Sequence, residues 1–578
     1  MSTKYFKTII SAVIVLFTAF SCSVKDGNYS IEIYAVNDVH GKFFDSLYVG
    51  DQANSSSLAN VSQYLKVRRY EIGDAKIAMI DLGDALQGDN SVFYANYIDT
   101  STTQKHLFTR VMEYIGYDAM VVGNHDIEAG HRVYDKIMSE TTIPYLAANA
   151  IDVKSGKSYF KPYTIFSKDG VDIAVIGMTN PNIKKWLGEE LWSGMDFLPI
   201  EYVADSLVRE VREKFSPDIV VLAIHAGLGD GSPEDIENPA RYLAANIKGI
   251  DILFSSHDHQ TACEKIWNGQ DSVLLMEGGS RAKYLIKVTS DLSFVKGELV
   301  SKSFTGELIK LDSIGIDNDY VKHFRADYLK TKSFTNQEIG TLYEDINTTD
   351  AFFGPSSYIN LIHSVQLAQS GAQISMAAPL TYNGHIDAGK LIYHDLFTIY
   401  PFENQLYVLE LTGQQLLDCL EYSYDRWINT VNSQDDHLMR IRYDSNRGNY
   451  SFVFPAYNFD SAAGIIYDVD VREPYGRRVK IVSMSNGEKF NPEYTYTVAM
   501  SSYRANGGGD LLTKGAGISK EELPEIIINK FDDIRGMIYD FYKAGNYHQK
   551  MIEAQWRFVP EQLVKLPIER DKALLFGN

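Results

Sequence analysis

Cysteine is scarce in this 578-residue chain, which contains three: Cys22, Cys263 and Cys419. Because Cys263 and Cys419 fall in different predicted domains, a disulfide framework is not expected to hold the fold together. Positive charge is also in short supply, since 55 Lys and Arg face 75 Asp and Glu and the formal net charge is −20. A long nucleic-acid backbone requires clustered basic side chains, so this composition argues against a polymeric nucleic acid as partner.

Repetitive sequence is missing as well. The chain has no long low-complexity tract, heptad run or fixed-period repeat, which argues against coiled-coil and solenoid folds. Hydrophobic residues make up 45% of the chain, and its length exceeds that of a single ordinary core. We therefore expect a globular protein of two domains.

The first 22 residues have the pattern of an export signal. Lys4 and Lys7 precede an apolar run over 8–20, which is typical of a secretory signal peptide. Residues 19–22 resemble a bacterial lipobox, in which Cys22 becomes the lipidated first residue of the mature protein. We expect secretion across the inner membrane and lipid anchoring through Cys22, in the periplasm or at the outer membrane. Ordinary cleavage with free release is the alternative, and no protein partner is evident.

Five apolar segments with the composition of buried strands each end in polar residues; they span 31–36, 77–80, 119–122, 219–224 and 252–254. Directly after them, or at their ends, stand seven side chains able to bind metal: Asp38, His40, Asp84, Asn124, His225, His257 and His259. Amphipathic helices alternate with these strands, so the pattern predicts an α/β domain of helix-covered sheets whose strand ends gather the ligands. One histidine alone is more often a core or loop residue, but seven such groups favour a metal site.

Imidazole and carboxylate ligands suit zinc, manganese or iron, and Asp84 can bridge two cations because it has two oxygens. Two cations roughly 3.5 to 4 Å apart can hold a phosphate, polarise its oxygens and lower the pKa of a bound water. The sequence therefore predicts a phosphoesterase with two divalent metal ions, Mn, Zn or similar. In its mechanism a metal-activated hydroxide attacks phosphorus without a covalent intermediate.

The order of these motifs resembles the signature of the calcineurin-like metallophosphoesterases: Asp38-x-His40, Gly83-Asp84, Gly123-Asn124-His125, His225 and His257-x-His259. The resemblance implies a first metal held by Asp38, His40, Asp84 and His259, and a second held by Asp84, Asn124, His225 and His257. It also implies a four-layer metallophosphoesterase domain.

The same resemblance implies that His125 stabilises charge in the transition state. The family places an acidic residue shortly after this histidine as its support. Asp126 and Glu128 both lie there, and Glu128 has the spacing at which an aspartate is usual. Ser256 stands where the family commonly has a glycine, a departure that leaves the predicted ligands in place.

The carboxyl-terminal half predicts a second α/β (α+β) domain, with a helix over 358–370, a strand and turn over 374–380 and a strand over 406–412 that enters a helix. Three runs in this half resemble the 5′-nucleotidase C-terminal domain: Tyr400-Pro401-Phe402-Glu403-Asn404, Leu411-Thr412-Gly413 and the stretch over 502–509. The resemblance implies a nucleotide substrate whose base stacks between Phe402 and Tyr503. For Phe402, a core position is an equally good interpretation.

The expected boundaries are a signal segment at 1–22, the metallophosphoesterase domain at 28–305, a charged helical linker at 306–339 and the C-terminal domain at 340–560. The 5′-nucleotidase branch carries Asn-Gly-Gly-x-x-Arg where this chain has residues 377–380, without that arginine.

Three further segments, 180–186, 237–240 and 457–470, resemble the branch of 2′,3′-cyclic-nucleotide 2′-phosphodiesterases/3′-nucleotidases. We therefore expect this activity, with 5′-nucleotidase or UDP-sugar hydrolase as the alternative. A non-catalytic surface binding lipoprotein is a third, less favoured hypothesis.

Overall fold

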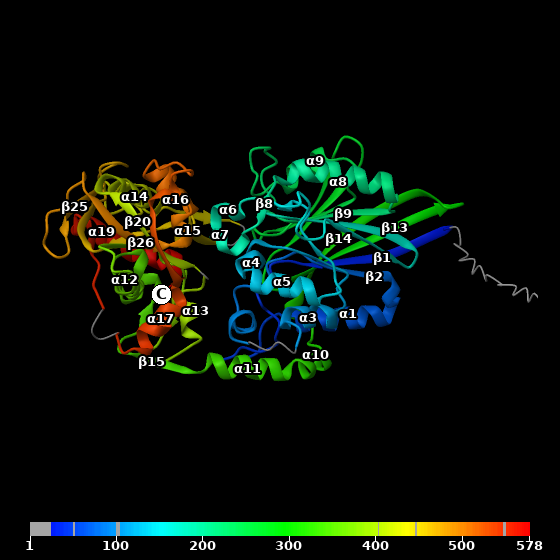
Figure 1. The fold of residues 1–578 in the computed structure, drawn as a ribbon, viewed down its shortest axis with the longest axis horizontal. Helices are drawn as coiled ribbons and strands as arrows, with labels where there is room; N and C mark the ends of the chain where they lie inside the picture. Colours follow the sequence, from blue (N-terminus) through cyan, green and yellow to red (C-terminus); the bar gives the residue numbers. More distant parts are fainter. Residues whose placement is uncertain are drawn as a thin grey trace, which may run out of the picture.

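The computed structural model describes residues 25–49, 52–99, 104–402, 404–445, 448–546 and 551–577. The expected signal segment, with Cys22, lies outside these ranges. The chain forms two domains in succession, and Figure 1 shows the blue-to-green first domain beside the second, which continues to red. Within the described ranges, every helix is too short or too polar to span a bilayer.

The first domain is built on two six-stranded sheets. One contains β1 (Gly27–Val36), β2 (Ile77–Asp81), β3 (Ala119–Val121), β4 (Tyr145–Leu146), β13 (Tyr284–Val295) and β14 (Glu298–Lys310), in the order β14-β13-β1-β2-β3-β4. The other contains β6 (Tyr163–Lys168), β7 (Val171–Thr179), β9 (Ile219–His225), β10 (Ile252–Phe254), β11 (Thr261–Trp267) and β12 (Ser272–Gly278), in the order β11-β12-β10-β9-β7-β6. Neighbours among β1 to β4 and among β7, β9, β10 and β12 are parallel, so their carboxyl ends share an edge of each sheet.

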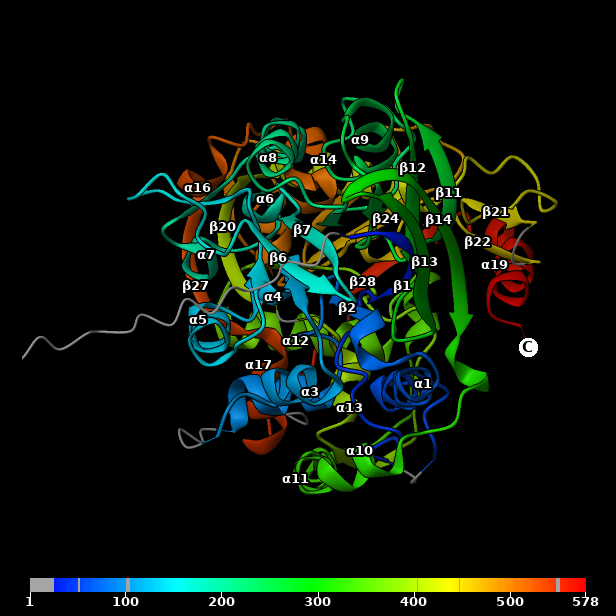
Figure 2. The ribbon, with the colours of Figure 1, turned by 90° about the vertical axis from the view of Figure 1, so that its right-hand side faces the viewer.

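Helices surround the two sheets. They are α1 (Leu58–Ile72), α2 (Asn90–Phe93), α3 (Leu107–Ile115), α4 (Asn124–Glu128), α5 (His131–Glu140), α6 (Ile183–Trp186), α7 (Glu189–Trp192), α8 (Ile200–Phe215) and α9 (Ala240–Asn246). The longer helices cover the outer faces of the sheets, whereas α6 and α7 lie on the side toward the second domain (Figure 1). Figure 2 shows α8 and α9 above the strands and α1 and α3 below them. A short pair, β5 (Ala150–Asp152) and β8 (Met195–Phe197), completes the domain.

The burial pattern of β1 explains the layers. Ile33 and Ala35 lie in the core between the two sheets, whereas Tyr34 and Val36 lie in the core beneath α1, α3 and α5. Side chains alternate along a strand, so a strand that is apolar at every position must be covered on both faces. A third core joins the other sheet to α8 and α9. The predicted four-layer α/β fold is confirmed.

The second domain contains a five-stranded sheet of order β23-β17-β26-β20-β27 and a three-stranded sheet of order β25-β24-β28. Their strands are β17 (Ile374–Ala377), β20 (Gln405–Thr412), β23 (Ser461–Ala463), β24 (Ile465–Asp470), β25 (Val479–Met484), β26 (Thr495–Ser501), β27 (Ile527–Asp533) and β28 (Gln555–Val559). The smaller sheets pair β15 (Glu338–Leu342) with β19 (Gly389–Ile392), β16 (Ile346–Asn347) with β18 (His385–Ile386), and β21 (Ile441–Asp444) with β22 (Asn449–Phe452). The helices are α12 (Ser357–Ser370), α13 (Asp395–Ile399), α14 (Gly413–Trp427), α15 (Ser502–Ala505), α16 (Leu523–Ile526), α17 (Ile534–Lys543) and α19 (Glu561–Phe576).

The central sheet of this domain also separates two cores. On β20, Tyr407 and Leu409 face the α14 side, and Leu406 and Val408 face the α12 and α17 side. The Leu-Thr-Gly motif marks the junction between β20 and α14. There Thr412 Oγ1 accepts from the backbone N–H of Gln415 at 3.1 Å, which caps the helix.

The expected linker folds as two helices, α10 (Asn318–His323) and α11 (Arg325–Thr335), which pack on the first domain. Tyr320, Phe324 and Tyr328 join its core, and the Tyr320 hydroxyl donates to Phe43 O at 3.0 Å. Figure 1 shows α11 running beneath the domains toward β15. The expected boundary at 305 falls inside β14, whose pairing with β13 continues to Lys310, and α19 adds buried residues to the second domain beyond 560.

Candidate metal centre and substrate cavity

The seven predicted ligands meet at the carboxyl edges of the two sheets of the first domain. Five of them have backbone φ angles in the left-handed region: Asp38 (48°), His40 (47°), Asp84 (56°), His257 (87°) and His259 (59°). Residues with a β-carbon rarely adopt this conformation, and such strain concentrates at functional sites. The chain therefore bends at these positions to point side chains at a common place.

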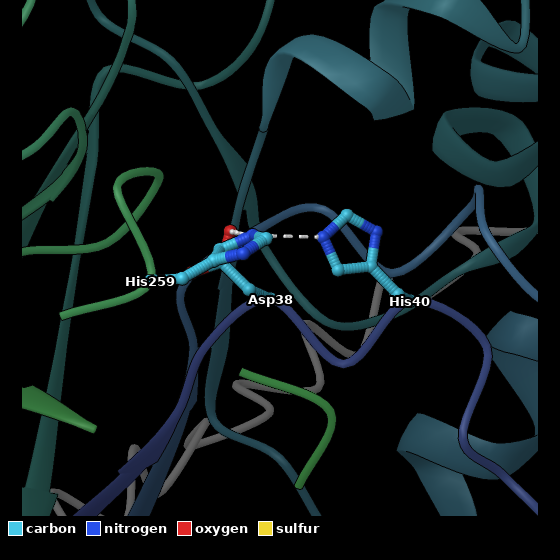
Figure 3. A group of neighbouring side chains, drawn as sticks. All are labelled: Asp38, His40 and His259. Carbon is cyan, nitrogen blue, oxygen red and sulfur yellow. Dashed lines mark hydrogen bonds and ion pairs between the residues drawn. The ribbon is translucent and has the colours of Figure 1, made fainter. Parts of the chain in front are cut away.

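One group consists of Asp38, His40 and His259, whose ligand atoms all lie within 4.8 Å of one another. His40 Nε2 is 3.1 Å from His259 Nε2, and His259 Nε2 is 3.5 Å from Asp38 Oδ1. Figure 3 shows the three side chains converging from two separate loops.

A second group consists of Asp84, His225 and His257, again within 4.8 Å of one another. His225 Nε2 lies 3.1 Å from Asp84 Oδ2. Asn124 joins this group through Oδ1, which is 3.1 Å from His225 Nε2 and 2.9 Å from His257 Nδ1. All seven predicted ligands are therefore brought together in two adjoining clusters.

The hydrogen bonds behind the histidines show that these residues fit metal ions. His40 Nδ1 is 3.0 Å from Gln87 O, and His225 Nδ1 is 2.8 Å from Leu82 O. A carbonyl oxygen only accepts, so Nδ1 carries the hydrogen in each ring and the Nε2 lone pair faces the cluster. There the lone pairs meet other acceptor atoms, and the buried Asp38 Oδ1 has no hydrogen-bond partner among the described residues. A cation supplies the positive charge that this arrangement of acceptors requires.

The charges of the isolated side chains point the same way. Burial by itself raises the pKa of Asp84, but His225 and His125 outweigh it and hold that pKa well below its usual value. Burial lowers the pKa of His225, yet Asp84 raises it to about 10. At His40 burial wins and lowers the pKa to about 3, so this ring is neutral and presents its Nε2 lone pair. The raised pKa of His225 reflects the positive charge that Asp84 attracts to the second cluster.

His125 begins its own interaction network beside the metal cluster. Its Nδ1 contacts Glu128 Oε2, and its backbone N–H donates to Asp84 Oδ1 at 2.8 Å. Burial lowers the pKa of His125, but Asp84 and Glu128 raise it to about 9. Asp126, the other acidic neighbour, instead accepts from the backbone N–H groups of Gly123 at 2.8 Å and Asp84 at 3.0 Å. Glu128 is thus the acidic residue that contacts His125, while Asp126 braces the ligand loops.

A cavity of about 580 Å³ lies between the two domains next to this cluster. From the first domain it is lined by His125, Glu128 and the ligands Asn124, His257 and His259, among others. From the second domain both predicted stacking residues, Phe402 and Tyr503, reach its wall. The structure therefore places Phe402 at the cavity, half-buried rather than fully within the core.

Sequence reasoning gave no role to three other residues that line this cavity: Trp186, Glu237 and Tyr457. The Trp186 ring stacks on His257 with centroids 5.3 Å apart and planes 21° apart. Glu237 Oε1 lies 3.6 Å from His257 Nε2. All three belong to the segments that resemble one branch of nucleotide hydrolases. That resemblance is the feature of the sequence from which their place at the cavity could have been predicted.

A buried arginine, Arg535, supports the segment of Phe402. Arg535 donates to the carbonyl oxygens of Tyr400 and Pro401, each at 2.9 Å, and of Phe402 at 3.1 Å. Its guanidinium lies 4.0 Å from the centroid of the Phe397 ring. These contacts fix the segment that presents Phe402 to the cavity.

Two family models match the chain. Residues 31–261 match the calcineurin-like phosphoesterases, and residues 336–514 match the 5′-nucleotidase C-terminal domain. A 2′,3′-cyclic-nucleotide 2′-phosphodiesterase/3′-nucleotidase of Salmonella typhimurium is 23% identical over 86% of this chain and 84% of its own length. A 5′-nucleotidase of Vibrio parahaemolyticus is 24% identical over 79% of this chain and 90% of its own length.

The fold is also that of a solved structure, a proposed 5′-nucleotidase of Staphylococcus aureus in complex with α-ketoglutarate. The similarity covers 92% of this chain and 100% of that one, with a TM-score of 0.74 at 22% identity. Calcineurin-like phosphoesterases use divalent metals, in agreement with the two clusters described above. The chain therefore belongs to the phosphoester hydrolases that join a calcineurin-like phosphoesterase domain to a 5′-nucleotidase C-terminal domain.

Proposed function

We propose that this nucleotide phosphohydrolase is a 2′,3′-cyclic-nucleotide 2′-phosphodiesterase/3′-nucleotidase with two divalent cations, Mn, Zn or similar. One observation carries the proposal. The segments that resemble this branch are far apart in sequence, yet Trp186, Glu237 and Tyr457 from them line a single cavity beside His257. The name of the Salmonella relative agrees with it.

Another group of residues that line the cavity supports the same branch. Ala377, Ala378 and Leu380 line it at the position where the 5′-nucleotidase branch carries an arginine. An apolar wall provides no charge-assisted hydrogen bond to an anionic group of the substrate. We infer that this end of the substrate is the uncharged base and not a second phosphate.

The proposed ligand sets follow the two clusters. Asp38, His40, Asp84 and His259 would hold the first cation, and Asp84, Asn124, His225 and His257 would hold the second. When bound, the cations supply Lewis acidity toward the phosphate oxygens and a water of lowered pKa as the nucleophile. The charge of Asp84 acts on both Asp38 and His40 of the first cluster, while its Oδ2 lies 3.1 Å from His225 Nε2 of the second, which supports the proposal that both cations would share this carboxylate.

Other residues orient the substrate and stabilise charge. His125, held through Nδ1 by Glu128, turns Nε2 toward the cavity and donates to a non-bridging phosphate oxygen as charge develops there. Phe402 and Tyr503 stack on the nucleobase, each contact contributing roughly 1 to 3 kcal/mol. Hydrolysis of the 2′ ester of a cyclic substrate leaves a 3′-nucleotide, from which the same site releases phosphate and a nucleoside.

A 5′-nucleotidase or UDP-sugar hydrolase is the second candidate, because Phe402 belongs to a run that resembles the 5′-nucleotidases and it lines the cavity. The two are separated by phosphate release from purified protein loaded with manganese or zinc. Substrates are 2′,3′-cyclic AMP, 3′-AMP and 5′-AMP, and chelator-treated protein is the control. A preference for the first two supports the proposal; a preference for 5′-AMP rejects the branch and retains the metal chemistry.

A third candidate, a non-catalytic binding lipoprotein, is tested by the metal content of the same preparation. About two ions per chain with turnover excludes it, whereas no bound metal and no turnover would revive it. We also propose export and lipid anchoring through Cys22, facing the periplasm or the exterior, on the strength of the amino-terminal motif. Labelling of cells with a fatty acid, compared with Cys22→Ala, tests the anchor.

A further inference from the structure

The residue Gln366 on α12 lines the substrate cavity although its side chain is almost entirely buried, at 1% exposure. Its amide oxygen Oε1 accepts from the Ser375 hydroxyl at 2.7 Å. Among the hydrogen bonds within the described ranges, none uses the Gln366 amide nitrogen. One end of this amide is therefore occupied, and the other retains two N–H groups to donate at a residue that lines the cavity.

A relay of buried groups holds the amide in this orientation. Ser375 Oγ also lies 2.9 Å from His363 Nδ1, and His363 Nε2 lies 3.4 Å from Ser461 Oγ. Burial lowers the pKa of His363 to about 3, so the ring is neutral. Since Ser375 gives its proton to Gln366, the hydrogen of His363 on Nδ1 donates to Ser375, and the chain runs in one direction from His363 to Gln366.

The surroundings indicate what this donor binds. Ile362, Met376, Ala377 and Leu380 line the same part of the second domain's wall, and Phe402 lies on the same cavity. A fixed amide N–H in such an apolar, aromatic setting is the kind of polar group that orients a ligand in a pocket. A flat heterocycle stacked on an aromatic ring presents its edge groups sideways, toward walls of this kind.

We propose that Gln366 reads the edge of the nucleobase by donating to an acceptor on it, a ring nitrogen or an exocyclic carbonyl, and that Ser375 positions the Gln366 amide for this role. The inference rests on the proposed nucleotide substrate but not on which phosphate the enzyme removes. Base selectivity in this enzyme then depends on the Gln366 N–H donor. Some bases lack an acceptor at the position that this donor faces, or carry an amino group there instead.

The test compares kcat and KM for four nucleoside monophosphates carrying adenine, guanine, cytosine or uracil. The phosphate is at the 3′ or the 5′ position, whichever the enzyme prefers in the comparison under Proposed function. The kcat/KM for each nucleotide is divided by the kcat/KM for p-nitrophenyl phosphate, a substrate without a base that reports the metal centre and the fold. Gln366→Met removes the donor, and Gln366→Glu replaces it with an acceptor of the same shape. Gln369→Glu is the matched control, because Gln369 is exposed on the same helix and does not line the cavity.

For Gln366→Met we expect the normalised kcat/KM of the best nucleotide to fall about tenfold, mainly because KM rises. The normalised kcat/KM values of the four bases should become more alike. Gln366→Glu is expected to shift preference toward bases that present an amino group. Ser375→Ala should also narrow the differences, with a smaller loss, because the amide nitrogen is retained but free to rotate.

An unchanged base profile in both Gln366 variants overturns the inference, and so does an equal loss for all four bases. If wild-type protein hydrolyses p-nitrophenyl phosphate but no nucleotide, the proposed function itself fails. The two failures are thus distinguished within one data set.

Discussion

The ion pair between Arg504 and Asp460 makes a demanding prediction, because both side chains are buried, at 3% and 1% exposure. Arg504 Nη2 is 2.6 Å from Asp460 Oδ2, and Nε is 2.9 Å from the same oxygen. Arg504 also donates to Asn458 Oδ1 at 2.8 Å, Gly508 O at 2.9 Å and Tyr457 O at 2.6 Å. One guanidinium therefore joins the segment of Tyr457 to the glycine-rich loop that follows Tyr503.

Asp460→Asn keeps the shape of the side chain but leaves the charge of Arg504 buried and uncompensated. Removing one partner of a buried pair destabilises proteins by about 3 to 5 kcal/mol. We expect the lower end of that range, because the three neutral acceptors of Arg504 remain. The KM for nucleotides should rise in the same variant, since Tyr457 and Tyr503 lose their common support.

Urea unfolding followed by fluorescence measures this loss, because Trp427 and Trp556 lie in the core of the same domain. Circular dichroism provides a second probe, since a two-domain chain need not unfold in one step. The double variant Asp460→Asn with Arg504→Met removes both charges, so its destabilisation should be smaller than the sum of the two single changes by about 2 kcal/mol. The reasoning would be refuted if Asp460→Asn lowered the free energy of unfolding by less than about 1 kcal/mol. It would also be refuted if the losses of the two single variants simply added up in the double variant.

Three further changes test other parts of the molecule. Burial raises the pKa of Glu32, but hydrogen bonds, first among them that of Arg68, lower it to about 2 from an ordinary 4.5. The roughly 3 kcal/mol that ionised Glu32 contributes to the free energy of unfolding is therefore present above pH 4.5 and lost as the pH falls toward 2. Glu32→Gln should make the free energy of unfolding, measured by denaturation, depend less on pH between 4.5 and 2. Glu128→Gln should lower kcat about 100-fold with metal content unchanged, and a loss below about threefold by steady-state kinetics contradicts the role given to its histidine partner. A β-carbon at Gly123 would overlap Asp84 Oδ1, so Gly123→Ala should lose bound metal in elemental analysis, and full metal occupancy would contradict this.

Much of the first domain could be predicted from local patterns. The apolar runs that end in Asp38, Asp84 and His225 are strands because every position is buried on one face or the other. Parallel pairing then brings their ends to shared edges, so metal-binding residue types at those ends predict a metal centre without knowledge of the loops. The family resemblance, which gave Glu128 the spacing of the usual aspartate, pointed to the acidic residue that contacts His125 in the structure.

Boundaries and closing elements were harder to predict. The segment at 318–335 is charged on its exposed side, and its three buried aromatic residues commit it to the first domain. The last helix, α19, lies beyond the expected boundary at 560, and its Val564 and Leu575 complete the second core. Whether such helices are linkers or parts of a domain depends on a surface elsewhere that accepts them, and local periodicity does not contain that information.

By itself the sequence determined an α/β domain of helix-covered sheets, the residue types at the strand ends and hence the phosphoester chemistry, because strand periodicity and ligand chemistry are local properties. The four-layer arrangement came from the family resemblance. Only the tertiary structure decided that Trp186 and Glu237 of the first domain share a cavity with Gln366, Tyr457 and Tyr503 of the second. It also decided that one end of the Gln366 amide is occupied and the other available. Contacts of this kind depend on how two separately folded domains pack, and their free energy comes from pairs of residues that no local sequence pattern relates.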